Sequence, residues 1–333
     1  MAPIPQRLTI THRAWALARP MATARGIRTS TDVILAELYD GSARGRGEAV
    51  PIERFGESAE SVIAALEAMK PAIYTGLRRE TLQDAMPPGA ARNALDCAFW
   101  DIDAKRVYQN VIELGGFGPT RPVTTAYTLG FDTAVAMAVQ AAAQRTRQIL
   151  RLELGDEGDL ERVRAVRQAA PVSRLIIDAN EGWTADQLAA FMPELAELRV
   201  ELVEQPLPAD ADSALNGVAH PVALCADESC RSLGDLDGLT GTYSAVNIRL
   251  DKLGGLTAAM ALAAEAKRRG LRVVLGGSLG TSLGIAPALF IADQADIVAL
   301  DGPLHLAIDR GSALRYDGST VHPPNVNLWG GPG

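Results

Sequence analysis

The sequence predicts a (β/α) barrel of the TIM type with an N-terminal α+β capping domain. From residue 121 onward, short apolar runs alternate with stretches of helical periodicity, as in βα units that build a parallel sheet. Eight strands and seven helical segments can be placed there, which suits a closed barrel that lacks one last helix. The first part of the chain begins with β-rich segments and continues into helices. We therefore expect a cap at residues 1–120, to which 316–333 return, and a barrel at 121–315.

The cap is predicted from a hairpin signal and a helical stripe. Asp40-Gly41 follows a β-rich run and is typical of a two-residue hairpin turn. Leu95, Phe99 and Ile102 recur at helical spacing and share one face. The expected strands are 6–17, 32–39 and 45–50, and the expected helices are 59–69 and 90–105. The C-terminal segment is expected to pack back on these elements as a return strand.

The barrel elements follow from short apolar runs that are bounded by turn-forming residues. The expected strands are Val123–Thr128, Ile149–Leu154, Leu175–Asp178, Val200–Glu204, Val222–Asp227, Ala245–Arg249, Val273–Gly276 and Ile297–Asp301. Helices between them include Asp132–Arg147, Asp159–Ala169, Ala185–Leu198 and Thr257–Arg269. Asp132 and Asp159 are expected to cap the first two helices, because a carboxylate there accepts hydrogen bonds from free N–H groups of the first turn.

The composition excludes several classes of protein. Hydrophobic residues make up 47 % of the 333 residues and charged residues 22 %, so we expect a large core and no extended disorder. The net charge is −8 and no basic cluster is interleaved with aromatic residues, which argues against nucleic acid as a partner. No apolar run reaches the length of a membrane span, and the first residues lack the apolar core of a signal peptide. The three cysteines lack the spacing of a disulfide framework or zinc site. We expect a cytoplasmic enzyme that forms a homo-oligomer.

Three carboxylates end three successive expected strands. Asp178, Glu204 and Asp227 each follow an apolar run and precede a turn or helix, and they are 26 and 23 residues apart, about one βα unit each. Because the ends of neighbouring parallel strands meet at one mouth of a barrel, the three side chains are expected to lie together, where active sites of such barrels are found. Oxygen ligands with positions left open suit Mg²⁺. The sequence therefore predicts one Mg²⁺ per chain at this mouth of the barrel.

Seven motifs, in their order along the chain, resemble the enolase superfamily in its muconate-lactonizing branch, most of all the dipeptide epimerases and N-acyl amino acid racemases. They are Gly45-Arg46-Gly47-Glu48, Ala94-Leu95-Asp96-Cys97-Ala98-Phe99-Trp100-Asp101, Asp178-Ala179-Asn180, Val203-Glu204-Gln205-Pro206, Ala226-Asp227-Glu228-Ser229, Thr281-Ser282-Leu283-Gly284 and Asp301-Gly302-Pro303. The resemblance implies that Mg²⁺ binds the substrate carboxylate and stabilises the enediolate formed when the α-proton leaves; the handling of such intermediates by a Lys or His base with Mg²⁺ is known for this superfamily. It implies a racemase or epimerase of a dipeptide or N-acyl amino acid, of the Ala-Glu or N-acyl-Glu type.

The chain departs from this branch at the catalytic bases. Such epimerases carry a Lys-x-Lys on the second strand and an Asn-Ile-Lys on the sixth, so that two lysines face each other across the substrate. Here Glu153 and Arg249 stand at the base positions, and Arg151 stands at the outer lysine. Arginine stays protonated and makes a poor base. Glu153 could act alone on one face, pair with Arg249 across the mouth, or add an oxygen to the metal; Lys252 is a further candidate base. A one-base lyase and a silent relative that only binds metal and a carboxylate ligand therefore stay open as alternatives.

The remaining candidate residues concern the substrate and the surroundings of the metal. The resemblance matches Arg25, in the cap loop, to an arginine that holds a distal carboxylate, a task that suits its bidentate guanidinium. Dipeptide epimerases hold a free α-ammonium with Asp-x-Asp on the eighth strand, whereas here only Asp301 remains of the pair, which favours an N-acylated substrate. Thr128, Arg151, Ser278 and Asp301 are expected to contact the substrate. Asn180 and Glu228 are expected to support the metal ligands.

Overall fold

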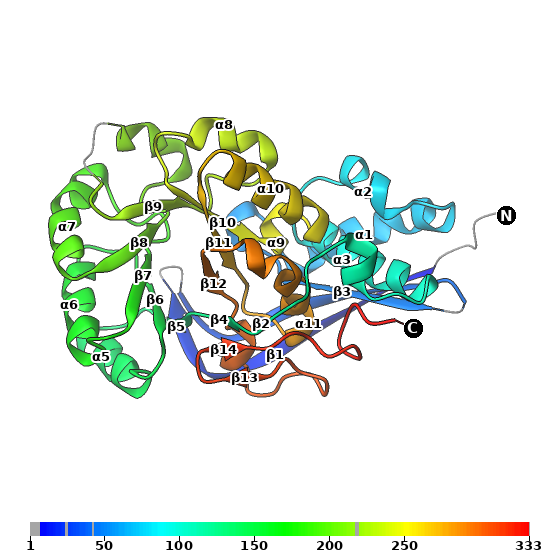
Figure 1. Cartoon of the computed structure of the whole chain (residues 1–333), viewed down its shortest axis with the longest axis horizontal. Coiled ribbons are helices and arrows are strands. Elements are labelled where there is room, and N and C mark those ends of the chain that lie inside the picture. Colours follow the sequence, from blue (N-terminus) through cyan, green and yellow to red (C-terminus); the bar gives the residue numbers. More distant parts are fainter. Residues whose placement is uncertain (1–6, 24–25, 42, 217–219, 333) are drawn as a thin grey trace.

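The computed structural model describes residues 7–23, 26–41, 43–216 and 220–332. It places an antiparallel sheet with helices beside a larger parallel sheet with helices on its outer side (Figure 1). The first of these regions is the cap, and the second is the barrel. The long strands of the cap run from its helices toward the barrel (Figure 1).

The cap sheet has the order β1-β2-β3 in the described residues. Its strands are β1 (Arg7–Thr23), β2 (Gly26–Tyr39) and β3 (Arg44–Ala49), and its helices are η1 (Glu53–Phe55), α1 (Ala59–Tyr74), α2 (Arg79–Ala85), α3 (Ala90–Arg106) and α4 (Val111–Gly115). A hairpin is confirmed at Asp40-Gly41, but four residues rather than two connect the strands, because Tyr39 pairs with Arg44. The Ala43 N–H donates to Asp40 Oδ1 at 2.8 Å, and Gly41 has φ +90°. The two expected cap helices correspond to α1 and α3.

Gly47 explains why the cap strand β3 carries the motif Gly-x-Gly-Glu. A Cβ added at Gly47 would lie 1.9 Å from the carbonyl oxygen of Ala94, and one added at Gly45 would lie 2.2 Å from that of Ala98. Both carbonyls belong to α3, so the backbone of the strand rests directly on the helix. This contact fixes where the next residue, Glu48, leaves the cap.

In the described part of the chain, eight parallel strands form one sheet, and their order in the sheet is the same as their order in the sequence. They are β5 (Tyr127–Leu129), β6 (Ile149–Glu153), β7 (Arg174–Asp178), β8 (Val200–Glu204), β9 (Ala223–Ala226), β10 (Ala245–Arg249), β11 (Arg272–Gly276) and β12 (Ile297–Ala299). The Ala126 N–H donates to the Val298 carbonyl at 2.8 Å, which brings the first and last strands together. The predicted TIM-type barrel is thereby confirmed as an almost closed one.

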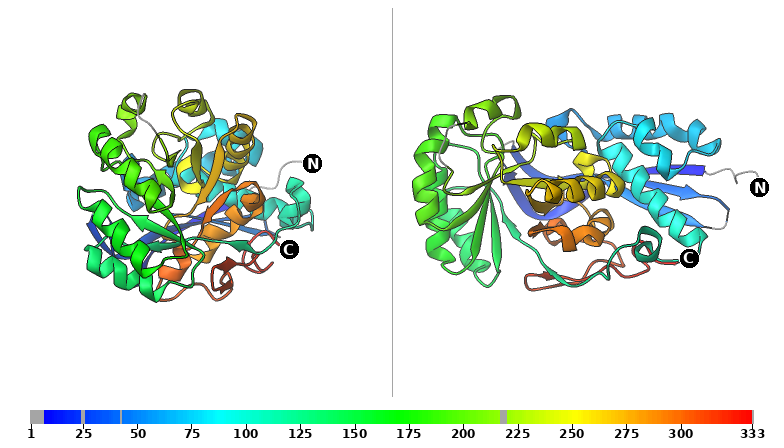
Figure 2. Two further views of the ribbon diagram at one scale, coloured as in Figure 1. Left: turned by 60° about the vertical axis from the view of Figure 1, so that its left-hand side comes forward. Right: turned by 45° about the horizontal axis from the view of Figure 1, so that its top comes forward.

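Helical segments of unequal length connect the barrel strands. They are α5 (Ala134–Ala143), α6 (Asp159–Ala169), α7 (Ala185–Glu197), η2 (Ala209–Leu215), η3 (Leu233–Asp235), α8 (Leu236–Leu239), α9 (Leu250–Leu253), α10 (Leu256–Arg268), α11 (Ser282–Ile285), η4 (Ala286–Gln294) and η5 (Gly302–His305). Figure 2 shows the green helices α5 to α7 along the outer side of the sheet. Their buried faces join the main hydrophobic core, while residues such as Ile149, Ile176 and Leu202 fill the barrel interior.

Two expectations about the barrel need correction. The first strand, expected at Val123–Thr128, is divided into β4 (Val123–Thr124) and β5, because β4 pairs with the C-terminal strand β14 (Thr320–Val321) rather than with the barrel. The helix caps are also shifted. Thr133, not Asp132, accepts from the first turn of α5, and Asp159 is the first residue of α6 rather than its cap.

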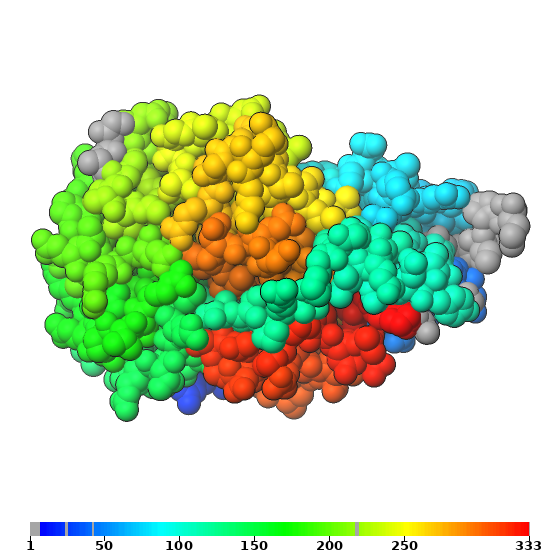
Figure 3. Space-filling model, viewed as in Figure 1, coloured from blue at the N-terminus to red at the C-terminus, as the bar shows by residue number. Residues whose placement is uncertain are grey.

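The C-terminal segment connects the barrel with the cap. Its hairpin, β13 (Tyr316–Asp317) and β14, pairs with β4, and the residues that follow reach α3 and β3. There the Trp329 indole donates to the carbonyl of Arg46 at 2.9 Å, and the Gly330 N–H donates to Asp101 Oδ1 at 2.9 Å. Figure 3 shows this segment (red) beside the blue-green segment that leads into the barrel.

Buried polar groups form a seam between cap and barrel, which we define by Glu48, Asp96 and Asp251. Glu48 accepts from the Thr281 N–H at 2.9 Å and from Arg310 Nη2 at 2.6 Å. Asp251 accepts from Asn93 Nδ2 at 2.7 Å, and Asp96 accepts from the Thr257 hydroxyl at 2.6 Å. Each acid therefore links an element of one region to an element of the other, which holds the cap over the barrel mouth.

None of the helices in the described ranges combines the length and the apolar character that crossing a bilayer requires.

Candidate active site

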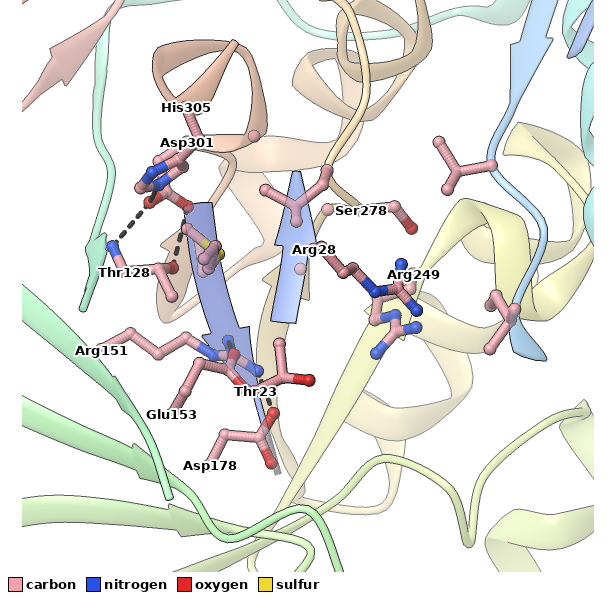
Figure 4. A pocket seen from close by; sticks show the side chains of 18 of the residues that line it. Thr23, Arg28, Thr128, Arg151, Glu153, Asp178, Arg249, Ser278, Asp301 and His305 are labelled. Carbon is pink, nitrogen blue, oxygen red and sulfur yellow. Dashed lines mark hydrogen bonds and ion pairs between the residues drawn. The ribbon is translucent and has the colours of Figure 1, made fainter. Parts of the chain in front are cut away.

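A pocket opens at the C-terminal ends of the barrel strands, below the β1–β2 hairpin (Figure 4). Its lining comes from the cap and from strand ends around the barrel: Met21, Thr23, Arg28, Val50, Pro51, Ile52, Glu53, Arg54, Thr128, Arg151, Glu153, Asp178, Asn180, Asn247, Arg249, Gly276, Gly277, Ser278, Leu279, Ala299, Asp301, Gly302 and His305. Residues from the cap thus complete a site whose floor belongs to the barrel. Arg25 lies outside the described residues.

Three acids end neighbouring strands in register. Glu153 on β6 is level with Asp178 on β7, which is level with Glu204 on β8. In parallel strands, residues at the same level point to the same side, so these like charges meet in one layer of the barrel. Arg151 lies two residues before Glu153 and therefore faces the same side of β6. The register alone places a guanidinium directly below three carboxylates.

Arg151 contacts all three of these acids. Its Nη1 donates to Glu153, and its Nη2 donates to Asp178 (Figure 4). Its Nε and Nη2 both donate to Glu204 Oε2, at 3.3 and 3.2 Å. The other Glu204 oxygen accepts from Asn247 Nδ2, and Asp178 Oδ1 accepts from the Asn180 N–H at 2.9 Å. One arginine therefore joins the second, third and fourth barrel strands.

Asp227 is held by two other cations. Arg249 Nη1 donates to its Oδ2 at 2.8 Å, and Lys252 Nζ donates to its Oδ1 at 2.5 Å. Burial works against the charge on Asp227, but Arg249 and Lys252 outweigh it and lower the pKa of the carboxyl. Burial likewise disfavours the charge on Arg249, but Asp227, Glu228 and Glu204 outweigh it and raise the pKa of the guanidinium. Arg249 therefore stays positively charged at any ordinary pH.

The acids outnumber the cations in this cluster. Burial and the neighbouring Glu204 raise the pKa of Asp178 well above its ordinary range, and Arg151 offsets only part of this effect. Burial raises the pKa of Glu204 as well, against the opposing effect of Arg151. Burial and Asp227 raise the pKa of Glu228 to about 7. By charge alone, the cluster would accept a further cation.

The geometry does not fit a divalent ion at the predicted ligands. Each carboxylate oxygen of Asp178, Glu204 and Asp227 already accepts a hydrogen bond from a protein donor. Within the described residues, Asp178 is the only one of the three that lines the pocket. In the same ranges, no group of three or more His, Cys, Asp or Glu side chains is placed so that it could hold a metal ion.

Glu153 and Arg249, at the positions of the missing lysines, lie on opposite sides of the pocket (Figure 4). Glu153 pairs with Arg151 rather than across the mouth with Arg249, and its Oε2 accepts from Asn180 Nδ2 at 2.9 Å. Asn180 reaches it from a left-handed backbone conformation with φ +51°. Arg249 lines the pocket, and its Nε is buried without a hydrogen-bond partner among the described residues. One side of the pocket therefore presents the carboxylate of Glu153, and the other presents the guanidinium of Arg249, whose Nε–H has no acceptor among the described residues.

At another end of the pocket, Thr128, Asp301 and His305 form a connected group (Figure 4). Asp301 Oδ2 accepts from the Thr128 N–H at 2.6 Å and lies 2.9 Å from His305 Nε2, and Asp301 Oδ1 accepts from the Thr128 hydroxyl at 3.2 Å. Burial disfavours the charge on Asp301, but the hydrogen bond and charge of His305, the Thr128 N–H and Arg151 together outweigh it and lower the pKa. Ser278 borders the pocket beside Gly276 and Gly277.

Lys252 does not suit the role of substitute base. Its side chain is only 1 % exposed and is absent from the described lining of the pocket. Its Nζ donates to Asp227 Oδ1, to the Asp227 carbonyl at 2.6 Å and to the Asn247 carbonyl at 2.8 Å. Three residues after Arg249 the strand has ended, and the first turn of α9 directs the lysine behind the acids. Its contacts are those of a group that holds Asp227 in place. Glu228 is buried beside Asp227 and likewise is not among the described lining residues.

The sequence interpretation did not assign Asn247, Arg28 or Arg54 to the site. Asn247 lies two residues before Arg249 on β10, so strand alternation could have placed it on the same inward face. Arg28 and Arg54 come from the cap and line the pocket on its open side. Their position depends on how the cap is docked, which no local pattern reveals.

Two family models match the chain. Residues 6–116 match the mandelate racemase / muconate lactonizing enzyme N-terminal domain, and residues 133–325 match the enolase C-terminal domain-like family. Together they cover most of the cap and the barrel.

Curated relatives are similar over nearly their whole length. An L-Ala-D/L-Glu epimerase from Escherichia coli (strain K12) is 44 % identical over 93 % of this chain and 97 % of its own. An N-acetyl-D-glutamate racemase from Pseudoalteromonas sp. is 38 % identical over 90 % of this chain and 95 % of its own. Both relatives change the configuration of an amino acid derivative.

Solved structures agree with this similarity. An enolase family member from Agrobacterium tumefaciens with homology to dipeptide epimerases, with bound sodium and L-Ala-L-Glu, has a TM-score of 0.95 and 46 % identity, covering 98 % of this chain and 100 % of its own. A dipeptide epimerase from Enterococcus faecalis V583, complexed with Mg and L-Leu-L-Tyr, has a TM-score of 0.88 and 25 % identity, covering 96 % of this chain and 98 % of its own. Metal ions and dipeptides thus occur together in structures that share this fold.

Proposed function

Because the chain belongs to the mandelate racemase / muconate lactonizing enzyme family of the enolase superfamily, we propose that it is an isomerase of a dipeptide or N-acyl amino acid, of the Ala-Glu or N-acyl-Glu type. Its relatives are dipeptide epimerases and an N-acetyl-D-glutamate racemase. The observation that carries the proposal for this chain is the pair Glu153 and Arg249, a carboxylate and a cation on opposite sides of one pocket.

In this proposal Arg249 binds the substrate carboxylate. Its guanidinium has a buried Nε without a partner among the described residues, and a fork of N–H donors matches a carboxylate. Removal of the α-proton next to that carboxylate places a second negative charge on its oxygens. A fixed cation at that point stabilises the developing charge more than it stabilises the substrate. Arg249 therefore binds the substrate and helps it to lose the proton.

Glu153 is the group that removes the α-proton. It ends β6 at the pocket, and Asn180 and Arg151 hold its two oxygens in a fixed orientation. Arg249, on the other side, has no lone pair to accept a proton at neutral pH. The proton taken by Glu153 consequently returns on the same side, so exchange of the α-proton is faster than inversion of the configuration.

The group around Asp301 favours an N-acylated substrate over a free amine. Both Asp301 oxygens already accept hydrogen bonds from Thr128, and His305 adds a third contact. Ala299, which also lines the pocket, has no carboxylate that could pair with an ammonium group. Less negative charge at this end lowers the affinity for a free N-terminus, whereas an amide can be accommodated.

A second candidate is a relative that binds its ligand without turnover. It is favoured by the engagement of both Glu153 oxygens, which leaves less of the carboxylate available for a proton. A homo-oligomeric state and a cytoplasmic location stay predictions for this chain, whereas the contacts of Arg151 with Asp178 and Glu204 argue against the predicted Mg²⁺. The proposed roles of Glu153 and Arg249 do not require the ion.

Exchange of the α-proton with solvent tests the proposal. The protein is incubated in D₂O with the D and L forms of N-acetylglutamate and with Ala-Glu, and the α-proton signal is followed by NMR. We expect loss of the signal with little change of configuration, and faster loss with N-acetylglutamate than with the dipeptide.

The other results separate the alternatives. Exchange coupled to full inversion would contradict the one-sided role of Glu153 while supporting an isomerase. No exchange, with N-acetylglutamate binding still detected by calorimetry, would contradict turnover and support the silent relative.

A further inference from the structure

We infer that the guanidinium of Arg151 takes the place of a divalent cation in this protein, so that the acids at the barrel mouth form a metal-independent cluster. This inference concerns the protein without substrate and does not depend on turnover. It departs from the ion predicted at Asp178, Glu204 and Asp227.

The reach of the side chain is set by strand geometry. Arg151 starts one inward-facing level below Glu153 on the same strand, and Glu153 is level with Asp178 and Glu204. A lysine at this level would present one compact charge, whereas arginine presents a planar fork with several donors. Here Nε, Nη1 and Nη2 are all used, on Glu204, Glu153 and Asp178 respectively. Arg151 thus contacts three acids from three strands at once, as a bound cation would.

The carboxylate oxygens that would bind a metal already accept hydrogen bonds from protein donors. Arg151 uses one oxygen each of Asp178 and Glu204, and Asn180 and Asn247 use the other two. Arg249 and Lys252 use the two oxygens of Asp227. A divalent ion would have to replace several of these hydrogen bonds and displace at least one cationic side chain, because Mg²⁺ requires near-octahedral oxygen ligands at about 2.1 Å.

Two of the three predicted metal ligands are also hardly accessible from the pocket. Of the three acids, only Asp178 is among the described residues that line the pocket, while Glu204 and Asp227 are 2 % and 1 % exposed. Arg151 itself lines the pocket and contacts the buried Glu204, and Arg249, which also lines the pocket, contacts the buried Asp227. An ion that entered from the pocket would find each of these two buried acids already paired with a guanidinium.

The two residues of β6 that replace lysines, Arg151 and Glu153, have opposite charges and pair with each other. In the pattern of the related epimerases both positions of Lys-x-Lys are positive, whereas here Arg151 is followed by the acid Glu153. Glu153 supplies the oxygen that Nη1 of Arg151 contacts. Because Glu153 replaces a lysine, Arg151 gains a third acidic partner. The two replacements therefore complement each other: one supplies a cation and the other supplies an acid that binds it.

Binding of Mg²⁺ alone tests the inference. Wild-type protein, Arg151→Met and the control Arg174→Met are each freed of metal with EDTA, and MgCl₂ is then titrated by calorimetry and by thermal unfolding. Arg174 is also a strand arginine paired with an acid, Glu201, but at the opposite end of β7 and half exposed. We expect wild type and Arg174→Met to show no change at ~10 mM Mg²⁺, and Arg151→Met to bind at least tenfold more tightly and gain several degrees, since a ligand of the folded state alone raises its stability.

The inference would be overturned if each wild-type chain bound one Mg²⁺ at submillimolar concentration and Arg151→Met bound it no more tightly. If Arg151→Met fails to fold, Arg151→Lys decides in its place, because it keeps the charge but lacks the fork; it should bind Mg²⁺ more tightly than wild type. Because no substrate is present, a failure of this test and a failure of the proposed isomerase are separate results.

Discussion

The seam and the barrel mouth both contain buried carboxylates, but their partners differ. In the seam, each acid has its own set of donors: Glu48 has Thr281 and Arg310, and Asp251 has Asn93 and the Val50 N–H. At the mouth, three acids share the guanidinium of Arg151. Acids with separate donors are positioned for structure, whereas acids in register with one shared cation retain excess negative charge. The comparison shows that burial alone does not distinguish the two groups of acids, whereas the sharing of one cation does.

The first prediction concerns the mouth. Glu153→Gln should lower the rate of α-proton exchange by at least ~100-fold, because an amide cannot accept the proton and a positioned base contributes roughly 10²–10⁴-fold. Exchange is measured by NMR in D₂O. Glu53→Gln is the matched control, since Glu53 also lines the pocket but is largely exposed and pairs with Arg28. Equal exchange rates in wild type and Glu153→Gln would remove Glu153 as the base.

The second prediction concerns the seam. Glu48→Ala should lower the free energy of unfolding by about 3–5 kcal/mol, because it leaves Arg310 and the Thr281 groups without their buried partner. Urea unfolding followed by circular dichroism measures the change. The control Glu53→Ala removes an exposed acid and should change the free energy by less than ~1 kcal/mol. A similarly small effect at Glu48 would mean that the seam does not hold the two regions together.

The third prediction tests the contact between β3 and α3. Gly47→Ala should destabilise the fold by about 1–3 kcal/mol or more, since its Cβ would collide with the Ala94 carbonyl. Gly238→Ala is the control, because a Cβ there meets nothing within 4 Å, and it should be neutral or slightly stabilising. Thermal unfolding of both variants, compared with wild type, measures the difference. Equal stability would contradict the close approach.

The fourth prediction uses pH. Burial raises the pKa of Asp96 to about 6, and the hydrogen bonds from Thr257 offset only part of the effect. The folded state therefore holds this proton more tightly than the unfolded state, so the stability that it contributes is present at low pH and is lost as pH rises through about 6. Between pH 5 and 8 wild type should lose about 1–2 kcal/mol that Asp96→Asn keeps. Urea unfolding across this range measures it, and parallel pH profiles of the two proteins would contradict the assignment.

Much of the barrel could be predicted because its signals are local. The strands ending at Glu204 and Arg249 were predicted at their observed bounds, since each is an apolar run of strand length that a polar residue or turn ends. The division of Val123–Thr128 could not be predicted. It depends on the Thr125 N–H donating to the carbonyl of Ser319 at 2.8 Å and on the pairing of β4 with β14, which are contacts between residues far apart in the sequence.

The sequence predicted which acids end the barrel strands, but not the contacts that these acids make. Sequence spacing brought Asp178, Glu204 and Asp227 to successive strand ends, because one βα unit separates each pair. The position of Arg151 among the acids depends on strand register and on the length of one side chain. Neither is encoded in a local pattern, so the sequence predicted the metal and did not predict the guanidinium that we infer takes its place.

Anomalous diffraction from crystals of the wild-type protein grown with Mn²⁺ and N-acetylglutamate would test the replacement of the ion by Arg151 most directly. The account predicts no anomalous peak among Asp178, Glu204 and Asp227, with Arg151 still contacting the first two and the ligand carboxylate on Arg249. A peak within bonding distance of all three acids, with Arg151 turned away from them, would contradict it.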